Sequence, residues 1–136
     1  MPNVTDFDNG FSALHPEARE GIRLFDTKRY FEAHEALETA WREEPGEIRN
    51  LYRGILQVAV AYYHIQRGNY VGARKLFNRC RKWLEPFPNT MMGIDLDQFH
   101  RDFSMVENTL IRLGPDLAAQ LDPGLMKPLP RVSEKR

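Results

Sequence analysis

The positions of the prolines limit what this chain can fold into. The sequence has 136 residues and nine prolines, and none of the nine lies between residues 46 and 85. Proline costs about 3 kcal/mol inside a helix, whereas it is tolerated in the first helical turn and directly after the last one. We therefore expect the prolines to mark helix ends and the proline-free stretch to hold long helices of the core.

Apolar residues between these boundaries recur at intervals of three and four, the period of an amphipathic helix. The pattern predicts helices over residues 16–27, 30–44, 47–66, 70–85 and 95–114. Gly68 suits the left-handed position that ends a helix, and Asp95 with Gln98 has the spacing of a capping box. No segment alternates apolar and polar residues for long enough to predict a strand. The fold class is therefore predicted to be all-α.

The composition predicts an ordinary globular protein, with 42% hydrophobic and 28% charged residues. Nineteen basic and nineteen acidic residues give a formal net charge of zero, which argues against a surface built throughout for nucleic acid or an anionic membrane. No apolar run approaches the roughly 20 residues of a membrane span, and the first residues lack the pattern of a signal peptide. The single cysteine, Cys80, excludes an internal disulfide. We expect a cytoplasmic protein.

Two stretches of the sequence repeat each other at an offset of 40 residues. Their spacing resembles the second helix of a tetratricopeptide repeat, although two units fall short of the three that such arrays usually need. The paired positions are Tyr30 with Tyr70, Ala33 with Ala73, Leu37 with Phe77 and Ala40 with Cys80. The prediction is a compact bundle of about five helices, made of two repeat-like antiparallel hairpins and a closing helix.

The domain organisation follows from the same boundaries. Residues 1–114 are predicted to form the helical domain, and residues 115–136 a short helix followed by an extended, proline-rich tail. The tail carries the apolar residues Leu125, Met126 and Leu129. It is expected either to fold back into a groove of its own domain or to sit in a neighbouring subunit.

Polar residues on the apolar faces of helices 30–44 and 47–66 form a seam. His34 and Glu38 lie one turn apart on the first helix, and Arg53, Gln57 and His64 share one side of the second. A tight antiparallel hairpin would place His34 level with Gln57 and Glu38 level with Arg53. Two interpretations follow: the pairs fix the register of the hairpin, or the same residues line a pocket for a small ligand or a metal.

The metal interpretation rests on the string His34-Glu35-x-x-Glu38. Zinc proteases use histidine-glutamate-x-x-histidine on a helix, but here a glutamate stands where the second imidazole would be. The candidate ligands of a metal site are therefore His34 and Glu38, with or without His64. Our first interpretation includes no cofactor.

The seam lies within a longer pattern that resembles a known family. Phe31-Glu32-Ala33-His34-Glu35-x-x-Glu38-x-x-Trp41, Gly54-x-x-Gln57 and His64-x-x-x-Gly68-Asn69-x-x-Gly72-Ala73 resemble domain of unknown function family 309, over residues 25–88. The resemblance implies a small all-helical fold of bacteria, archaea and plastid-bearing organisms, with no assigned activity. The family pattern selects six candidate residues: His34, Glu35, Glu38, Trp41, Gln57 and His64. The seventh candidate, Arg53, comes from the helical spacing alone. The family has glycine where this chain has Lys28, so the turn there is expected to be built differently.

Charge is distributed unevenly along the chain. Residues 32–47 hold six acids and one base, and residues 67–82 hold six bases and no acid. The basic stretch places candidates for contact with RNA or another polyanion on one helix, at Arg74, Lys75, Arg79 and Lys82. The acidic and basic helices are expected either to face each other across the bundle or to form opposite flanks.

These observations favour a non-enzymatic binding or scaffold module. Its partner would be a protein segment or a small ligand, bound on a helical face or in the seam, and the module could form a homo-oligomer. The first alternative is a metal-binding protein or metal-dependent enzyme, and the second is a protein that binds RNA or another polyanion. No membrane partner is expected, and nucleic acid is not the expected main partner.

Overall fold

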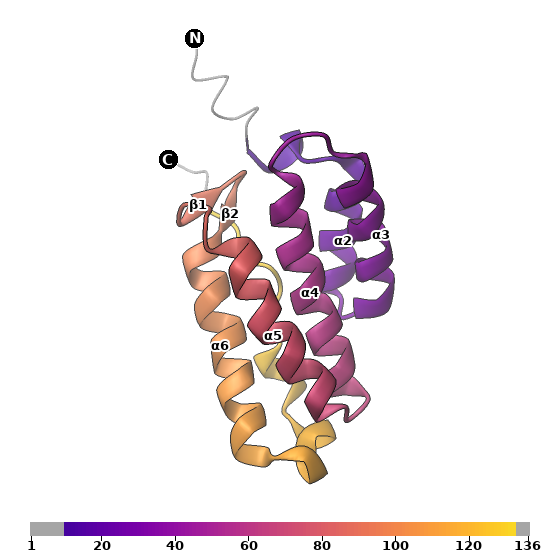
Figure 1. The fold of residues 1–136 in the computed structure, drawn as a ribbon, viewed down its shortest axis with the longest axis vertical. Helices are drawn as coiled ribbons and strands as arrows, with labels where there is room; N and C mark the ends of the chain where they lie inside the picture. Colours follow the sequence, from indigo (N-terminus) through magenta and orange to yellow (C-terminus); the bar gives the residue numbers. More distant parts are fainter. Residues whose placement is uncertain (1–9, 133–136) are drawn as a thin grey trace.

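Five α-helices joined by short connections make up most of residues 10–132, the part of the chain that the computed structural model describes (Figure 1). They are α2 (Pro16–Asp26), α3 (Tyr30–Glu43), α4 (Arg49–Gln66), α5 (Tyr70–Leu84) and α6 (Leu96–Leu113). Short 3-10 turns lie at η1 (Phe11–Ala13), η2 (Pro115–Gln120) and η3 (Pro123–Leu125). The predicted all-α class is confirmed, and each predicted helix is present with ends within two residues of the expected ones.

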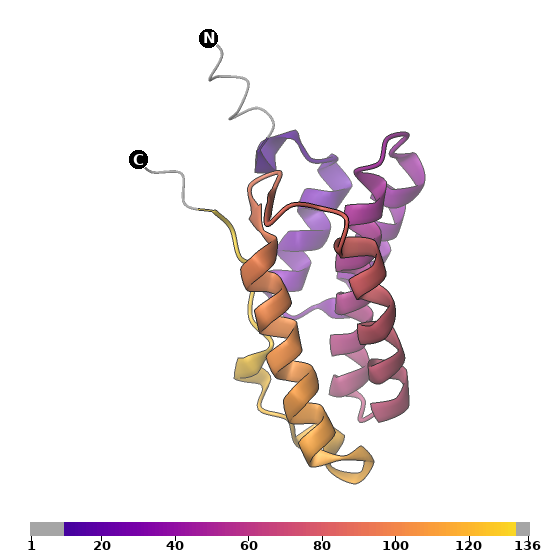
Figure 2. The same ribbon diagram turned by 60° about the vertical axis from the view of Figure 1, so that its left-hand side comes forward.

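The helices pack in chain order. α2 and α3 form one antiparallel hairpin, α4 and α5 form a second, and α3 packs on α4, so that α4 lies between α3 and α5 (Figures 1 and 2). α6 lies beside α5 and closes the bundle. None of the helices within residues 10–132 is long and apolar enough to cross a membrane.

Six buried aromatic rings hold the five helices together. Five of them form a closed cycle in which each ring contacts the next at a centroid distance of 5.2 to 6.2 Å. In order, the cycle is Phe25 of α2, Tyr62 of α4, Phe77 of α5, and Phe103 and Phe99 of α6. Tyr30 of α3 contacts both Phe25 and Tyr62 at 5.3 Å. Each helix therefore contributes at least one ring to the same cluster.

The turn between α2 and α3 is built like the turn between α4 and α5. Lys28 has a φ of 65° and Gly68 a φ of 73°, forty residues apart. After each, a backbone N–H reaches back five residues, from Arg29 to the Leu24 carbonyl at 2.9 Å and from Asn69 to the His64 carbonyl at 2.8 Å. This is the Schellman motif, which usually takes glycine at the left-handed position. The expectation of a different turn at Lys28 is therefore wrong: the lysine adopts the conformation that glycine favours.

A small hairpin between α5 and α6 was not predicted. Strands β1 (Thr90–Met91) and β2 (Ile94–Asp95) pair antiparallel around Met92 and Gly93, both of which have positive φ. This two-residue turn matches the twist of the strands. Strands of two residues are too short to show a period of two, which is why the sequence pattern did not reveal them. Asp95 then caps α6, because its side chain accepts a hydrogen bond from the Gln98 N–H at 3.0 Å.

The C-terminal segment folds back on its own domain, which was one of the two expected placements (Figure 2). Met126 and Leu129 are buried, and the Leu129 N–H donates to Asp26 Oδ1 at 2.9 Å. Arg131 forms an ion pair with the same carboxylate at 2.9 Å. The Lys28 ammonium donates to the carbonyls of Pro123, at 2.9 Å, and of Met126. Residues at the end of α2 thus anchor the segment.

Lys28 is expected to couple the turn to this segment. In Lys28→Met the left-handed backbone stays and the ammonium's hydrogen bonds are lost, which should lower the free energy of unfolding by about 1 kcal/mol. Lys28→Gly loses the same bonds but relieves about 1 kcal/mol of left-handed strain, so it should be close to neutral. Urea unfolding of the wild type and both variants measures the free energies of unfolding. Equal destabilisation by Lys28→Met and Lys28→Gly would contradict the strain that we assign to the left-handed lysine.

Candidate functional site

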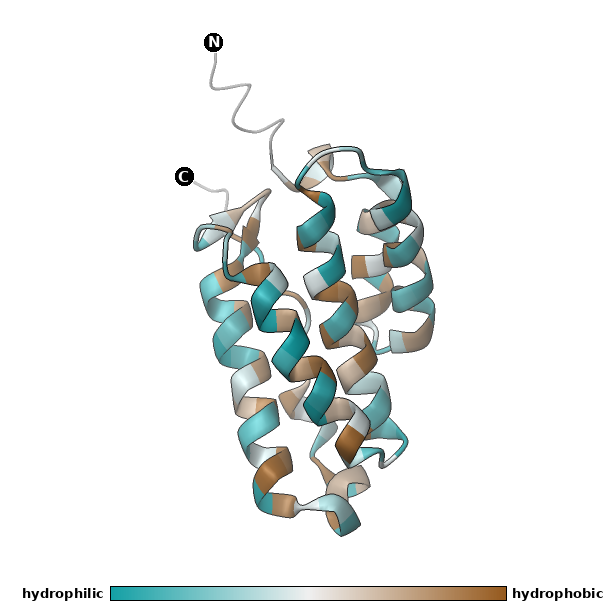
Figure 3. Ribbon diagram, in the orientation of Figure 1, coloured by the Kyte–Doolittle hydropathy of each residue, from teal (hydrophilic) through white to brown (hydrophobic). Residues whose placement is uncertain are grey.

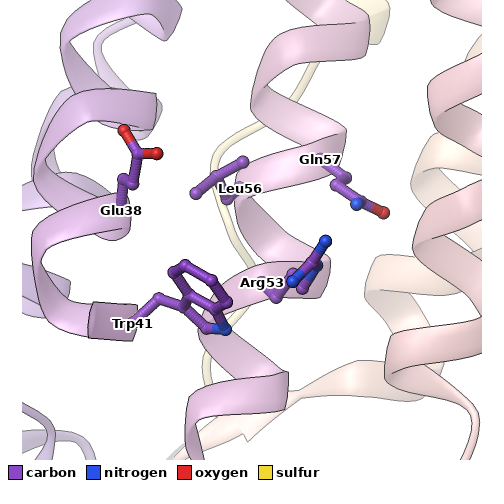
Figure 4. Close-up of a pocket in the computed structure, with 5 residues that line it drawn as sticks. All are labelled: Glu38, Trp41, Arg53, Leu56 and Gln57. Carbon is purple, nitrogen blue, oxygen red and sulfur yellow. The ribbon is translucent and has the colours of Figure 1, made fainter. Parts of the chain in front are cut away.

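A pocket of about 210 Å³ lies at the junction of α3 and α4, where the sequence predicted a polar seam. Its wall consists of two residues from α3 and three from α4: Glu38, Trp41, Arg53, Leu56 and Gln57. Figure 4 shows Trp41 extending from α3 toward Arg53 of α4, with Leu56 between the two helices. Four of these five residues were predicted as seam candidates, and the structure brings those four to one site.

The predicted ion pair between Glu38 and Arg53 is absent. Glu38 Oε2 instead accepts a hydrogen bond from Arg42 Nη2 at 3.1 Å, one turn along α3, and 37% of the Glu38 side chain is exposed. The expected pairing assumed a tight turn, but residues 44–48 separate the two helices. The relative position of α3 and α4 therefore differs from that of a tight hairpin.

Arg53 lies between two tryptophan rings. Its guanidinium carbon is 5.0 Å from the ring centroid of Trp41 and 4.5 Å from that of Trp83 on α5. Arg49 covers Trp41 as well, at 4.7 Å. Within residues 10–132, Arg53 takes part in no ion pair and no hydrogen bond, because its contacts are with the faces of the indoles.

The predicted hydrogen bond between His34 and Gln57 is also absent. Gln57 is only 7% exposed, and its Oε1 has no hydrogen-bond partner among the described residues. His34 Nδ1 is likewise buried without a partner in that part of the chain, and its ring packs against Phe31 at 5.6 Å. An unpaired buried polar atom typically costs about 1–3 kcal/mol. These atoms therefore mark places where the described residues leave a buried polar atom without a hydrogen bond.

The remaining seam candidates point elsewhere. His64 Nδ1 is 3.2 Å from the side-chain amide nitrogen of Asn69, in the turn before α5. Burial is the main cause that lowers the pKa of His64, and the positive charge of Arg67 lowers it further. Glu35 is exposed on α3 and does not line the pocket. Residues 10–132 contain no group of three histidine, cysteine, aspartate or glutamate side chains placed to hold a metal ion. The expected grouping of His34, Glu38 and His64 is therefore not formed.

The basic candidates on α5 divide into two groups. Arg74 turns toward α6, where its Nε lies 3.4 Å from Glu107 Oε2, whereas Lys75, Arg79 and Lys82 are exposed. Figure 3 shows hydrophilic residues along the outward side of α5. Because α4 separates α5 from α3, the basic and acidic helices lie on opposite flanks of α4 and do not face each other.

Trp83 is the site residue that sequence reasoning missed. No spacing rule relates residues of α4 to those of α5 before the helices are packed. One signal was available: Arg53 directly precedes the apolar middle of residues 47–66 and needs a partner, and the chain has only two tryptophans.

Double-mutant cycles separate the expected pair from the observed one. Arg53→Met combined with Trp83→Leu should show a coupling of about 0.5–2 kcal/mol in the free energy of unfolding, because the cation–π contact exists only when both residues are present. Arg53→Met combined with Glu38→Gln should be additive within about 0.5 kcal/mol. Urea titrations provide both values. A larger coupling for Glu38 than for Trp83 would contradict this arrangement.

Comparison with known proteins relates part of the helical core to a family. Residues 18–76 match the family described as "Domain of unknown function (DUF309)", a stretch that contains all five pocket residues. The "Uncharacterized protein YpuF" of Bacillus subtilis (strain 168) is 39% identical over 77 residues, which are 56% of this chain and 44% of YpuF. The chain thus spans less than half the length of this relative. Both the family and YpuF are uncharacterised, so the comparison assigns no activity. The resemblance drawn from the sequence is confirmed over residues 18–76, the stretch that matches the DUF309 family.

Proposed function

We propose that this protein is a non-enzymatic binding module that takes up a segment of a partner protein in the pocket between α3 and α4. One observation carries the proposal. The pocket wall includes a guanidinium, that of Arg53, and a buried amide oxygen, that of Gln57, and neither has a hydrogen-bond partner within residues 10–132. A bound segment can donate a hydrogen bond to the Gln57 oxygen and accept hydrogen bonds from the Arg53 guanidinium.

The size of the pocket supports a protein segment over a large cofactor. Sites for drug-sized molecules usually have volumes of about 300–1,000 Å³. The volume here, about 210 Å³, suits one side chain or one chain end of a longer segment.

The scaffold around the pocket also supports binding. We propose that the α2–α3 and α4–α5 hairpins act as tetratricopeptide-like units that hold the pocket residues at fixed positions. The aromatic cluster supplies the rigidity, because its rings join α3, α4 and α5 to one another. Burial raises the pKa of the Cys80 thiol to about 12, and an inert thiol suits the cytoplasm, where we propose that the module works.

The alternatives have weaker support. A metal-dependent role would use His34 and Glu38, with or without His64, but Glu38 pairs with Arg42 and His64 lies beside Asn69. RNA binding would use the exposed Lys75, Arg79 and Lys82, but Arg74 is paired with Glu107. Neither alternative explains the unpaired groups in the pocket.

A matched pair of variants tests the proposed function. Glu38→Trp fills the mouth of the pocket, whereas Glu35→Trp makes the same change at an exposed position of α3 outside the pocket. Peptides selected on the wild-type protein from a phage-displayed random library should bind Glu38→Trp at least tenfold more weakly. Their affinity for Glu35→Trp should stay within twofold, as measured by fluorescence anisotropy.

Two results would contradict the proposal. The library could yield no peptide that binds the wild-type protein, or the selected peptides could bind Glu38→Trp as well as they bind the wild type. Circular dichroism of both variants checks that each retains the helical fold.

A further inference from the structure

We infer that the group bound in this pocket is a carboxylate of the partner segment, and that Arg53 is the residue that binds it. This inference rests on the proposed function and names the chemistry of the bound group. The carboxylate has two sources in a protein segment, an acidic side chain or the C-terminal end of the chain.

The position of Arg53 leaves one part of its guanidinium available. The guanidinium carbon lies over the rings of Trp41 and Trp83, at 5.0 and 4.5 Å from their centroids. A guanidinium has five N–H donors in a planar fork, and Arg53 donates none of them to an acceptor within residues 10–132. Arg53 is half-buried and lines the pocket, so its N–H groups are available to a bound acceptor.

The charge of the site favours an anion. Three arginines of α3 and α5 have an acidic partner: Arg42 pairs with Glu38, and Arg74 and Arg81 pair with Glu107. Arg53 instead has a second arginine, Arg49, on the same tryptophan. A partly desolvated cation next to another cation attracts a negative ligand, and the two indoles strengthen the attraction by excluding water.

The rim of the pocket favours a carboxylate over a phosphate. A guanidinium can bind either group through two parallel hydrogen bonds. However, Glu38 also lines the pocket, and its negative charge would repel a phosphate dianion more strongly than a carboxylate with one charge.

Glu38 and Gln57 offer acceptor oxygens, and a protein segment can provide the N–H donors for them. Glu38 uses Oε2 for Arg42, and its Oε1 is not part of that bond. Gln57 Oε1 also needs a donor. The site therefore pairs one cation with two acceptor oxygens. A peptide matches this set, because its backbone N–H groups lie within a few bonds of an acidic side chain or of the terminal carboxylate.

The two tryptophans make the test direct. The chain has only these two, and both contact Arg53, so intrinsic fluorescence reports a group that binds to the guanidinium. Three probes are titrated at constant ionic strength: a tripeptide with one glutamate and both ends blocked, the same peptide with glutamine, and the glutamine peptide with a free C-terminal carboxylate. Inorganic phosphate is the fourth probe.

At least one carboxylate peptide is expected to bind at least tenfold more tightly than the blocked glutamine peptide and than phosphate. If the glutamate peptide binds, the source is an acidic side chain; if the peptide with the free end binds, the source is a C-terminus. Arg53→Lys keeps the charge but loses the planar fork, and should weaken the binding at least tenfold. Arg79→Lys, the same change at an exposed arginine of α5 outside the pocket, should leave it within twofold.

Three outcomes would overturn the inference: equal binding of the glutamine and carboxylate peptides, phosphate binding as tight as that of the carboxylate peptides, or unchanged binding by a folded Arg53→Lys protein. Failure here differs from failure of the proposed function. If library peptides bind the pocket and are blocked by Glu38→Trp while Arg53→Lys has no effect, the module stands and the carboxylate inference falls. If no library peptide binds, the proposed function itself fails.

Discussion

The cycle of buried rings formed by Phe25, Tyr62, Phe77, Phe103 and Phe99 is the interaction on which the rest of the structure depends. Aromatic side chains bury large apolar areas and add a specific edge-to-face geometry. Because one ring from α2 and two from α6 join the rings of α4 and α5, the cluster fixes the closing helix to both hairpins. The β1–β2 hairpin and the C-terminal segment pack against the five helices that this cluster joins.

A rigid core of this kind allows polar groups to be left unpaired at its edge. Arg53 and Gln57 lie one turn apart on α4, the helix that is packed on both sides. Ile55 and Tyr62 of the same helix are fully buried in the core. The cation–π contacts with Trp41 and Trp83 offset part of the cost of holding a charge there. Within residues 10–132, the N–H groups of Arg53 and the Oε1 of Gln57 form no hydrogen bonds, so these groups remain free to serve a ligand.

Lys28 shows how a local exception is stabilised by distant residues. A lysine in the left-handed conformation is strained, yet its ammonium reaches carbonyls of Pro123 and Met126, nearly one hundred residues along the chain. Asp26, two residues earlier, binds Leu129 and Arg131 of the same segment. The end of α2 is therefore both a turn and an anchor, a role that Gly68 at the equivalent turn cannot take.

The sequence by itself determined the helices, since prolines, the helical period and Gly68 act within a few residues of where they stand. It also identified four pocket residues, because helical spacing places Glu38 near Trp41, and Arg53 near Gln57, on the inner side of each helix. Only the tertiary structure decided their partners. Glu38 bonds to Arg42 on its own helix, and Arg53 stacks on Trp83 of α5, because the connection at residues 44–48 and the packing of α5 on α4 set the distances between helices. Periodicity gives the direction of a side chain, whereas its partner depends on how far neighbouring helices are shifted along and rotated about their axes, which no local pattern encodes.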